Sequence, residues 1–361
     1  MHYFLGCPEW SRPEWKGSLL PTRTRPADFL AGYARVFNTV EGNTTFYALP
    51  RPDVVERWKE STPSDFRFCF KFPRSITHDR KLENTIELTR DFFQRIAPLE
   101  ERIGPIQLQL SADFGRSCWP QLQQFLRQLP SDFRYAVEVR NLAYFDEQEI
   151  ERELDTFLRQ HQMARVLFDT HKLMASQNND STTIEAKRRK PKVPLRFTAT
   201  NELPLLRFVG DPQNALNYPV LRDWAQRVAS WMRQGFTPFV FLHTPDDVLA
   251  PQLARDFHGF LQEQLPELPP LPDFAGEVPQ PGEQLSLFAF TAKGPILFKQ
   301  STFHPCLVEI FKFQINSNHF KLGPSRIRVR RKLGNQKLKL VDAFFWLTQF
   351  VAIHVSHMNM S

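Results

Sequence analysis

The chain has 361 residues, enough for one large domain or two of ordinary size. Hydrophobic residues make up 42% and charged residues 24%, which is typical of a globular protein and excludes a fibrous or wholly disordered chain. The 4 cysteines form no CxxC pair, so neither a disulfide framework nor a cysteine-based zinc site is expected.

The formal net charge of +7 is unevenly distributed along the chain. Residues 289–361 contain eleven Lys and Arg residues and two acidic residues, so the preceding 288 residues carry a net charge of only −2. The sequence therefore predicts a nearly neutral body with a basic extension. Such a body is not expected to bind nucleic acid strongly without a partner.

The amino-terminal residues lack the basic and apolar regions of a secretory signal. No apolar run reaches the roughly 18 residues that a membrane-spanning helix needs. We therefore expect a cytoplasmic protein that does not bind membranes.

Runs of β-type residues alternate with helical patterns along the body. The expected strands are Tyr3–Cys7, Thr39–Asn43, Arg67–Phe72, Ile106–Leu110, Tyr135–Arg140, Arg165–Asp169, Leu205–Val209 and Phe239–His243. The expected helices are Ala27–Val36, Asp53–Ser61, Thr85–Ala97, Gln121–Gln128, Glu147–Arg159, Val220–Arg233 and Gln252–Gln264. This alternation predicts an α/β fold with parallel strands, and eight strands fit a (β/α)8 TIM-type barrel. The alternative is an open doubly wound sheet, which usually has a glycine-rich first turn that GCPEW does not supply.

Two segments depart from this alternation. His171–Pro204 is an insertion that contains the basic run Lys187–Lys192, and we expect either a solvated loop or a loop that contacts phosphate over the site. Leu265–Glu283 is rich in proline and resembles an extended linker. The predicted organisation is a barrel over residues 1–272, a linker over 273–288, and a basic extension over 289–361 outside the fold.

Polar side chains occur near the carboxyl ends of the expected strands, where a parallel sheet is usually apolar. They are Glu41, Asn43, Lys71, Gln109, Glu138, Arg140, Asp169, Arg207 and His243. Because side chains alternate between the two faces of a strand, residues of one parity can all point toward the barrel axis. Barrel active sites lie at this end. The alternative is that these charges form buried salt bridges of purely structural importance.

The residue types indicate a polar, anionic ligand. Carboxylates Glu41, Glu138 and Asp169 are candidates for acid/base catalysis or for holding a divalent cation, and His243 is a candidate proton carrier or metal ligand. Further ligand-binding candidates are Lys71, Arg140 and Arg207 for the anion, His78, Asn43 and Gln109 as polar contacts, and Trp10 and Tyr47 as stacking groups.

Hydrolysis and isomerisation are the reactions that this set of residues fits best. No glycine-rich signature of a nicotinamide or flavin site is found, and a divalent metal is the candidate cofactor. Glycosidases with this fold often have carboxylates at the ends of strands four and seven. Here Gln109 and Arg207 occupy those positions, so glycoside hydrolysis is not expected.

Several segments resemble the YecE-like family, a domain of unknown function with a TIM-barrel fold. They include GCPEWSRPEW, VEGNTTFYALPRPDVVERW, DFRFCFKFPRSITH, RIGPIQLQL, YAVEVRN and PFVFLHTPD. The resemblance implies the barrel but no settled reaction. Similar barrels among metal-dependent sugar-phosphate isomerases and apurinic endonucleases suggest phosphate or nucleic-acid chemistry by analogy of fold. Those enzymes use several histidine ligands, whereas only His78 and His243 lie near strand ends here, so a multinuclear zinc site is not expected.

A short motif follows the proline-rich linker. Its residues are Gln284, Leu285, Ser286, Leu287 and Phe288, and QLSLF resembles the pentapeptide that binds the bacterial sliding clamp. Leu287 and Phe288 would serve as apolar anchors. This motif supports an alternative function, a non-catalytic, nucleic-acid-associated module that the clamp recruits. A structural alternative is that its apolar residues pack against the barrel.

The basic extension has no counterpart in the resemblance. Arg326–Lys332 is suited to contact nucleic-acid phosphates. Val341–Val355 is apolar but is too short for a membrane span. We expect the extension to lack a stable fold.

Overall fold

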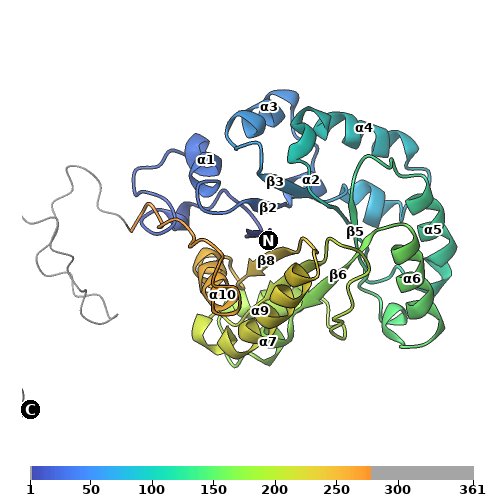
Figure 1. The fold of residues 1–361 in the computed structure, drawn as a ribbon. Helices are drawn as coiled ribbons and strands as arrows, with labels where there is room; N and C mark the ends of the chain where they lie inside the picture. The colour runs from blue at the N-terminus through green and yellow to red at the C-terminus, as the bar shows by residue number, and fades with distance from the viewer. Residues whose placement is uncertain (1, 278–361) are drawn as a thin grey trace, which may run out of the picture. The chain divides into compact units, whose positions relative to one another are not determined.

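The computed structural model describes residues 2–277 and contains eight parallel strands in that range. The strands form a six-stranded sheet of order β1-β8-β7-β6-β5-β4 and a two-stranded sheet of order β2-β3. Their bounds are β1 (Phe4–Gly6), β2 (Thr39–Gly42), β3 (Arg67–Phe70), β4 (Ile106–Gln109), β5 (Tyr135–Glu138), β6 (Ala164–Asp169), β7 (Leu205–Val209) and β8 (Phe239–His243). The larger sheet is curled into a half-barrel (Figure 1).

Helices connect the strands and surround them on the outside (Figure 1). Their bounds are α1 (Phe29–Tyr33), α2 (Thr44–Tyr47), α3 (Pro52–Glu60), α4 (Ile86–Ile96), α5 (Trp119–Arg127), α6 (Glu149–Gln160), α7 (His171–Ala175), α8 (Ser181–Arg189), α9 (Tyr218–Arg233) and α10 (Ala250–Gln264). Short 3-10 helices lie at Pro13–Trp15, Pro26–Asp28, Ala97–Arg102, Arg116–Cys118, Leu142–Phe145 and Asn214–Asn217, and a π-helical turn at Ser75–Asp79.

Proline marks the start of several outer helices. Pro52, Pro219 and Pro251 lie at the first or second position of α3, α9 and α10. A proline there removes only an N–H that has no partner within the helix, and its fixed φ already suits helical geometry. The sequence thus sets where these helices begin, as the predicted bounds anticipated to within two residues.

The two sheets approach each other through a few isolated backbone hydrogen bonds, including Gly104 N to Phe68 O at 2.9 Å. Glu41 N donates to Cys7 O at 3.1 Å beside β1, and Phe72 N donates to Gln107 O at 3.0 Å beside β4. Gly6 permits the first approach, because a Cβ atom at this position would overlap the Thr39 carbonyl oxygen. Strands β1 and β2 therefore lie close together without forming a regular ladder.

Most strands contribute to two apolar layers, whereas β2 and β4 have buried polar residues in place of inner apolar ones. Phe4, Val166 and Phe241 pack inside the curled sheet, whereas Leu5 and Leu167 pack between the strands and the outer helices. This alternation is what the period of two in a β-strand dictates. The inner layer ends in polar residues at the carboxyl ends of the strands, so the apolar core stops where the candidate site begins.

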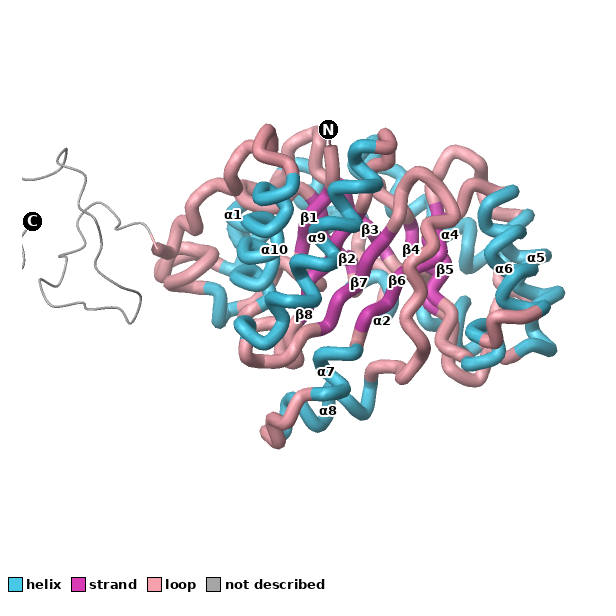
Figure 2. The backbone as a smooth tube through the Cα atoms, turned by 60° about the horizontal axis from the view of Figure 1, so that its bottom comes forward, coloured by secondary structure: helices cyan, strands magenta, loops and turns pink. Residues whose placement is uncertain are grey.

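The insertion after β6 is structured. It contains α7 and α8, and both helices lie beyond the carboxyl ends of the strands (Figure 2). Thr170 Oγ1, before the insertion, donates to Pro191 O at 3.3 Å. Within the insertion, Lys187 Nζ of α8 donates to Ser176 O, just after α7, at 2.5 Å. The insertion therefore forms a wall over one end of the sheet.

The alternation of strands and helices is confirmed, with β7 and β8 at the predicted bounds. The motif Gln284–Phe288, the basic segment Arg326–Lys332 and the apolar segment Val341–Val355 lie outside the described residues. In the part of the chain that is described, no helix combines the length and the hydrophobicity required to cross a membrane.

Candidate functional site

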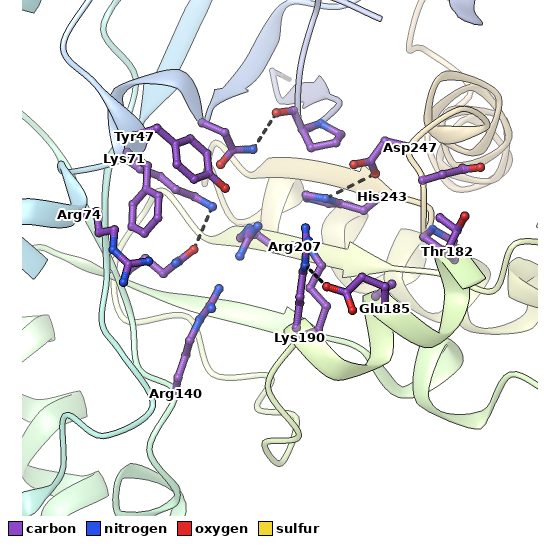
Figure 3. Close-up of a pocket in the computed structure, with 18 of the residues that line it drawn as sticks. Tyr47, Lys71, Arg74, Arg140, Thr182, Glu185, Lys190, Arg207, His243 and Asp247 are labelled. Carbon is purple, nitrogen blue, oxygen red and sulfur yellow. Dashed lines mark hydrogen bonds and ion pairs between the residues drawn. The ribbon is translucent and has the colours of Figure 1, made fainter. Parts of the chain in front are cut away.

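A cavity of about 750 Å³ opens at the carboxyl ends of the strands. Its floor includes Lys71 after β3, Gln109 of β4, Arg207 of β7 and His243 of β8. Residues of α8 and of the loop after β8 form its walls (Figure 3). Segments far apart in the sequence thus meet here because parallel strands present their carboxyl ends at one edge.

Glu41 lies at the centre of a buried charge cluster. Its Oε1 is 2.6 Å from Lys71 Nζ and 2.8 Å from Arg207 Nη2, and its Oε2 is 2.9 Å from His243 Nε2. Lys71 Nζ also donates to Gln109 Oε1 at 2.9 Å. One carboxylate therefore contacts three basic groups from three other strands or strand ends.

Glu138 is the second buried carboxylate. It accepts hydrogen bonds from Arg207 Nη1 and Arg140 Nε. Arg207 therefore bridges Glu41 and Glu138, and its guanidinium lies 4.5 Å from the centre of the Phe168 ring. These contacts fix Arg207 in one orientation. This arrangement suits a residue that positions the two carboxylates better than it suits a residue that binds a ligand.

Several buried polar atoms in this cluster lack a hydrogen-bond partner of good geometry among the described residues. They include both Glu41 carboxylate oxygens, Arg207 Nε and both His243 ring nitrogens. The Glu41 oxygens nevertheless have ion-pair contacts of 2.6–2.9 Å with Lys71, Arg207 and His243. Among the described residues, Arg207 Nε and His243 Nδ1 are therefore the atoms of this cluster without a close polar contact. The side-chain amide of Gln107, deeper between the strands, is also unpartnered. Such atoms are unusual in a structural cluster, because each unmet hydrogen bond costs stability.

The cluster shifts the pKa values of its members. Burial opposes ionisation of Glu41, but the charges of Arg207 and Lys71 outweigh it and hold its pKa well below the usual range. In the same way Arg140 and Arg207 overcome burial and lower the pKa of Glu138 to about 2. Burial and then the charge of Arg207 lower the pKa of Lys71 to about 7, although Glu41 opposes this shift. Two ionised carboxylates thus face a lysine that can exist without charge near neutral pH.

Three further titratable groups border the cavity. Burial lowers the pKa of His243 to about 3, so its ring is neutral at physiological pH. Burial, followed by the charges of Arg140 and Arg74, lowers the pKa of His78 to about 4. Burial raises the pKa of Asp247 to about 7, and Asp247 Oδ1 lies 3.8 Å from His243 Nδ1.

Positive charge dominates the cavity wall. Seven Lys and Arg residues and three carboxylates line it. Most of the cations have acidic partners, but Lys190 forms no ion pair within residues 2–277. Lys190 comes directly after α8, is half-buried, and lines the same cavity as Arg140 and Lys71 (Figure 3). Lys190 is therefore the one lining cation without an ion pair among the described residues.

Most of the predicted site residues meet in this cavity or directly beneath it. Glu41 and Glu138 lie beneath its floor, and the predicted residues that line it are Asn43, Tyr47, Lys71, His78, Gln109, Arg140, Arg207 and His243. Asn43 also donates to Pro8 O at 2.8 Å, and His78 packs edge-on against Phe46. Tyr47 is exposed at the rim.

Two predicted residues lie elsewhere. Asp169 points away from the sheet interior: its Oδ2 accepts a hydrogen bond from Trp224 Nε1 of α9 at 2.8 Å, and its Oδ1 accepts one from His171 N at 3.0 Å. Trp10 is buried against Trp58 and Phe68 and does not line the cavity. The expected inward orientation of Asp169 and the expected stacking position of Trp10 are therefore corrected.

Sequence reasoning did not select every residue at the cavity. Lys190 belongs to the basic run Lys187–Lys192, for which phosphate contact was one of two interpretations. Asp247 lies four residues after His243, and the turn after β8 brings the Asp247 carboxylate back toward the histidine ring. Arg12 lines the cavity but is paired with Glu9 at 2.6 Å, and its sequence context offers no clear signal.

A divalent cation was one of the predicted ligands. Within residues 2–277, no group of three or more His, Cys, Asp or Glu side chains is arranged to hold a metal ion. Glu41, the most central carboxylate, is already surrounded by three basic side chains. Glu41 and Glu138, two of the carboxylates predicted to hold such a cation, are thus engaged with basic side chains.

The fold and the cavity define an α/β protein whose curled parallel sheet carries a buried, positively charged pocket. A sequence profile described as "Protein of unknown function DUF72" matches residues 4–275, and the chain belongs to this family. It is 41% identical to UPF0759 protein YecE of Escherichia coli K12 over 285 residues, which cover 79% of this chain and 99% of that protein.

Solved structures of DUF72 proteins have a similar fold. A crystal structure from Enterococcus faecalis aligns with a TM-score of 0.56 and 20% identity, covering 79% of this chain and all of that one. A structure from Thermotoga maritima aligns with a TM-score of 0.55 and 24% identity, covering 74% of this chain and all of that one. At these identities the likeness concerns the fold alone.

Proposed function

We propose that the cavity binds a small anionic molecule, with a phosphate or carboxylate group held by Lys190 and Arg140. The observation that carries the proposal is the excess of cations on the wall, and above all Lys190, which forms no direct ion pair within residues 2–277. Arg140 uses its Nε for Glu138, which leaves the two terminal nitrogens of its guanidinium toward the cavity. A guanidinium and an ammonium are well suited to hold one anion together.

The same cavity supplies groups for acid/base chemistry, and a hydrolase or isomerase is the function that it fits best. Asp247 is suited to donate or accept a proton near neutral pH, because burial raises its pKa to about 7. Neutral His243 lies between Asp247 and the ionised Glu41. These groups could move a proton between the cavity and the buried cluster.

The proposal is tested by calorimetric titration and thermal shift with inorganic phosphate, ribose 5-phosphate and uncharged ribose. We expect the two phosphates to stabilise the protein and ribose to have no effect. Lys190→Ala should weaken phosphate binding about tenfold or more, since it removes one charge-assisted hydrogen bond. The affinity should also fall as the salt concentration rises.

Arg188→Ala is the matched control. Arg188 belongs to the same basic run, but it is exposed, pairs with Glu185 at 2.7 Å and does not line the cavity. Its substitution should leave the affinity within about twofold of the parent value. Equal losses in both variants, or equal stabilisation by ribose and its phosphate, would reject the proposed site.

We also propose that the eight strands close into a (β/α)8 barrel. The support is the hydrogen bond between Glu41 N and Cys7 O at one junction and that between Phe72 N and Gln107 O at the other. Cross-strand amide contacts between β1 and β2 in an NMR experiment would test closure.

Recruitment to a sliding clamp through Gln284–Phe288 stays a prediction. It is tested by measuring the binding of purified clamp to the full chain and to its Leu287→Ala/Phe288→Ala variant.

A further inference from the structure

Lys71 occupies an unusual position for a lysine. Its side chain is about 6% exposed, and its Nζ atom lies between the Glu41 carboxylate and the side-chain oxygen of Gln109. Nevertheless it lines the cavity, so a ligand can reach it from the open side (Figure 3). A buried ammonium has a large desolvation cost, which a purely structural position would rarely retain.

We propose that Lys71 is a nucleophile that forms an imine with a small aldehyde or ketone bearing a phosphate or carboxylate group. This inference rests on the proposed anion site, since Lys190 and Arg140 would hold the charged group of the same molecule. Figure 3 shows the three side chains directed toward one cavity from different walls. In this arrangement the charged group of the ligand binds to Lys190 and Arg140, and its carbonyl group lies at Lys71.

The burial of Lys71 and the neighbouring charge of Arg207 favour the reactive form of the amine. They lower the pKa of Lys71 to about 7, so a substantial fraction of the side chain is uncharged at neutral pH. An uncharged amine has the free electron pair that attacks a carbonyl carbon, whereas an ammonium does not. Burial and then the charge of Arg207 also lower the pKa of Lys190, while Asp247 opposes the shift, and a bound anion would favour the charged form of Lys190.

The reaction balances with groups already present. The Nζ electron pair forms a bond to the carbonyl carbon, the carbonyl π pair moves to oxygen, and a proton passes from nitrogen to that oxygen to give a carbinolamine. The nitrogen electron pair then forms the second carbon–nitrogen bond as the carbon–oxygen bond breaks. The remaining nitrogen proton passes to the departing hydroxyl group, and water leaves. The product is the imine, which is formed without oxidant or reductant. Glu41, 2.6 Å from Nζ, is placed to take up and return the proton from nitrogen.

The test is reductive trapping on the full-length chain. The protein is incubated with pyruvate or dihydroxyacetone phosphate and sodium cyanoborohydride, and the modified lysines are located by peptide mass mapping. We expect one reduced adduct at Lys71, at least tenfold above any other lysine in the chain. Acetone, a carbonyl compound without an anionic group, should label Lys71 no more than surface lysines. The two anionic probes distinguish a phosphate from a carboxylate as the preferred group.

Two variants complete the test. Lys71→Arg keeps the positive charge beside Glu41 and should abolish the specific adduct, while Lys190→Ala should lower its yield at limiting probe concentration. Mapping of the parent chain reports the modified site even if a Lys71 variant fails to fold. Labelling spread evenly over the lysines, or the absence of any adduct, overturns the inference. If phosphate binding persists in that case, the anion site stands and only the role of Lys71 falls. If neither the adduct nor phosphate binding is observed, both the role of Lys71 and the proposed anion site are rejected.

Discussion

Two buried charge clusters in this molecule differ in how their charged groups are paired and hydrogen-bonded. The pocket cluster consists of Glu41, Lys71, Glu138, Arg207 and His243. The second, which we call the β6–α6 cluster, consists of Glu151, Asp155, Arg165 and Arg196. Both bury arginine against carboxylates, yet only the first adjoins a large cavity at the carboxyl ends of the strands.

Hydrogen bonding distinguishes the two clusters. In the β6–α6 cluster, Arg165 contacts Glu151 and Asp155 at 2.8 Å each and also donates to Tyr144 O at 2.8 Å. Glu151 further accepts from Arg196 and from a backbone N–H, and none of these atoms is unpartnered among the described residues. The pocket cluster leaves several polar atoms without such partners. A saturated network serves the fold, whereas an unsaturated one beside a cavity marks a site.

The largest effect that we expect is on stability. Arg165→Ala leaves Glu151 and Asp155 buried with one cation fewer, and should lower the free energy of unfolding by about 3–5 kcal/mol. The variant should bind phosphate normally once folded, because Arg165 lies on the helix-facing side of β6. Urea denaturation followed by circular dichroism measures the first quantity, and titration at low urea measures the second.

Arg159→Ala is the control for this comparison. Arg159 contacts the same Asp155 at 3.7 Å from an exposed position one turn along α6. An exposed pair of this kind contributes only about 0.3–0.5 kcal/mol. If both variants lose the same stability, burial and saturation are not what stabilises the β6–α6 cluster.

The second prediction concerns the pH dependence of stability. The pKa of Lys71 is about 7 in the folded chain, lowered by burial and by Arg207, and about 10.4 in an unfolded chain. Between these values the unfolded state binds more protons, so the contribution of Lys71 to stability rises with pH. Relative to Lys71→Met, the parent chain should gain roughly 1–3 kcal/mol from pH 7 to pH 10.

The difference between the two chains isolates Lys71, because the other titrating groups are common to both. Lys59→Met serves as the control, since Lys59 is partly exposed and pairs with Glu100. Its stability curve should run parallel to that of the parent chain. A parallel curve for Lys71→Met as well would mean that Lys71 is ionised like an ordinary lysine.

Sequence periodicity predicted much of the fold and of the pocket. The alternation of strands and helices located all eight strands, and the shared parity of polar residues at the strand ends placed Glu41, Lys71, Glu138 and Arg207 together. Their detailed pairing could not be predicted, because Arg207 bridges carboxylates from two strands distant in sequence. The position of Lys190 also depends on tertiary contacts, since hydrogen bonds within the insertion direct the end of α8 to the cavity.

Strand β6 shows why parity alone failed for Asp169. The helix-facing side of this strand mixes polar and apolar residues, since Arg165 and Asp169 share it with Leu167, whereas the inner side is wholly apolar. The carboxylate partners of Arg165 lie on α6, and the indole N–H that donates to Asp169 belongs to Trp224 of α9. Nothing within the strand itself identifies those partners.

The smallest expected effect tests that corrected orientation. Asp169→Asn keeps one oxygen acceptor for the two donors, Trp224 Nε1 and His171 N, and should lower the free energy of unfolding by about 1 kcal/mol. Phosphate affinity should stay within twofold of the parent value, because Asp169 faces α9.

Glu138→Gln is the matched substitution inside the pocket cluster. It removes the charge that orients Arg140 and Arg207, so it should change the phosphate affinity severalfold while the protein remains folded. If Asp169→Asn alters phosphate affinity as much as Glu138→Gln does, the separation between pocket and structural carboxylates fails.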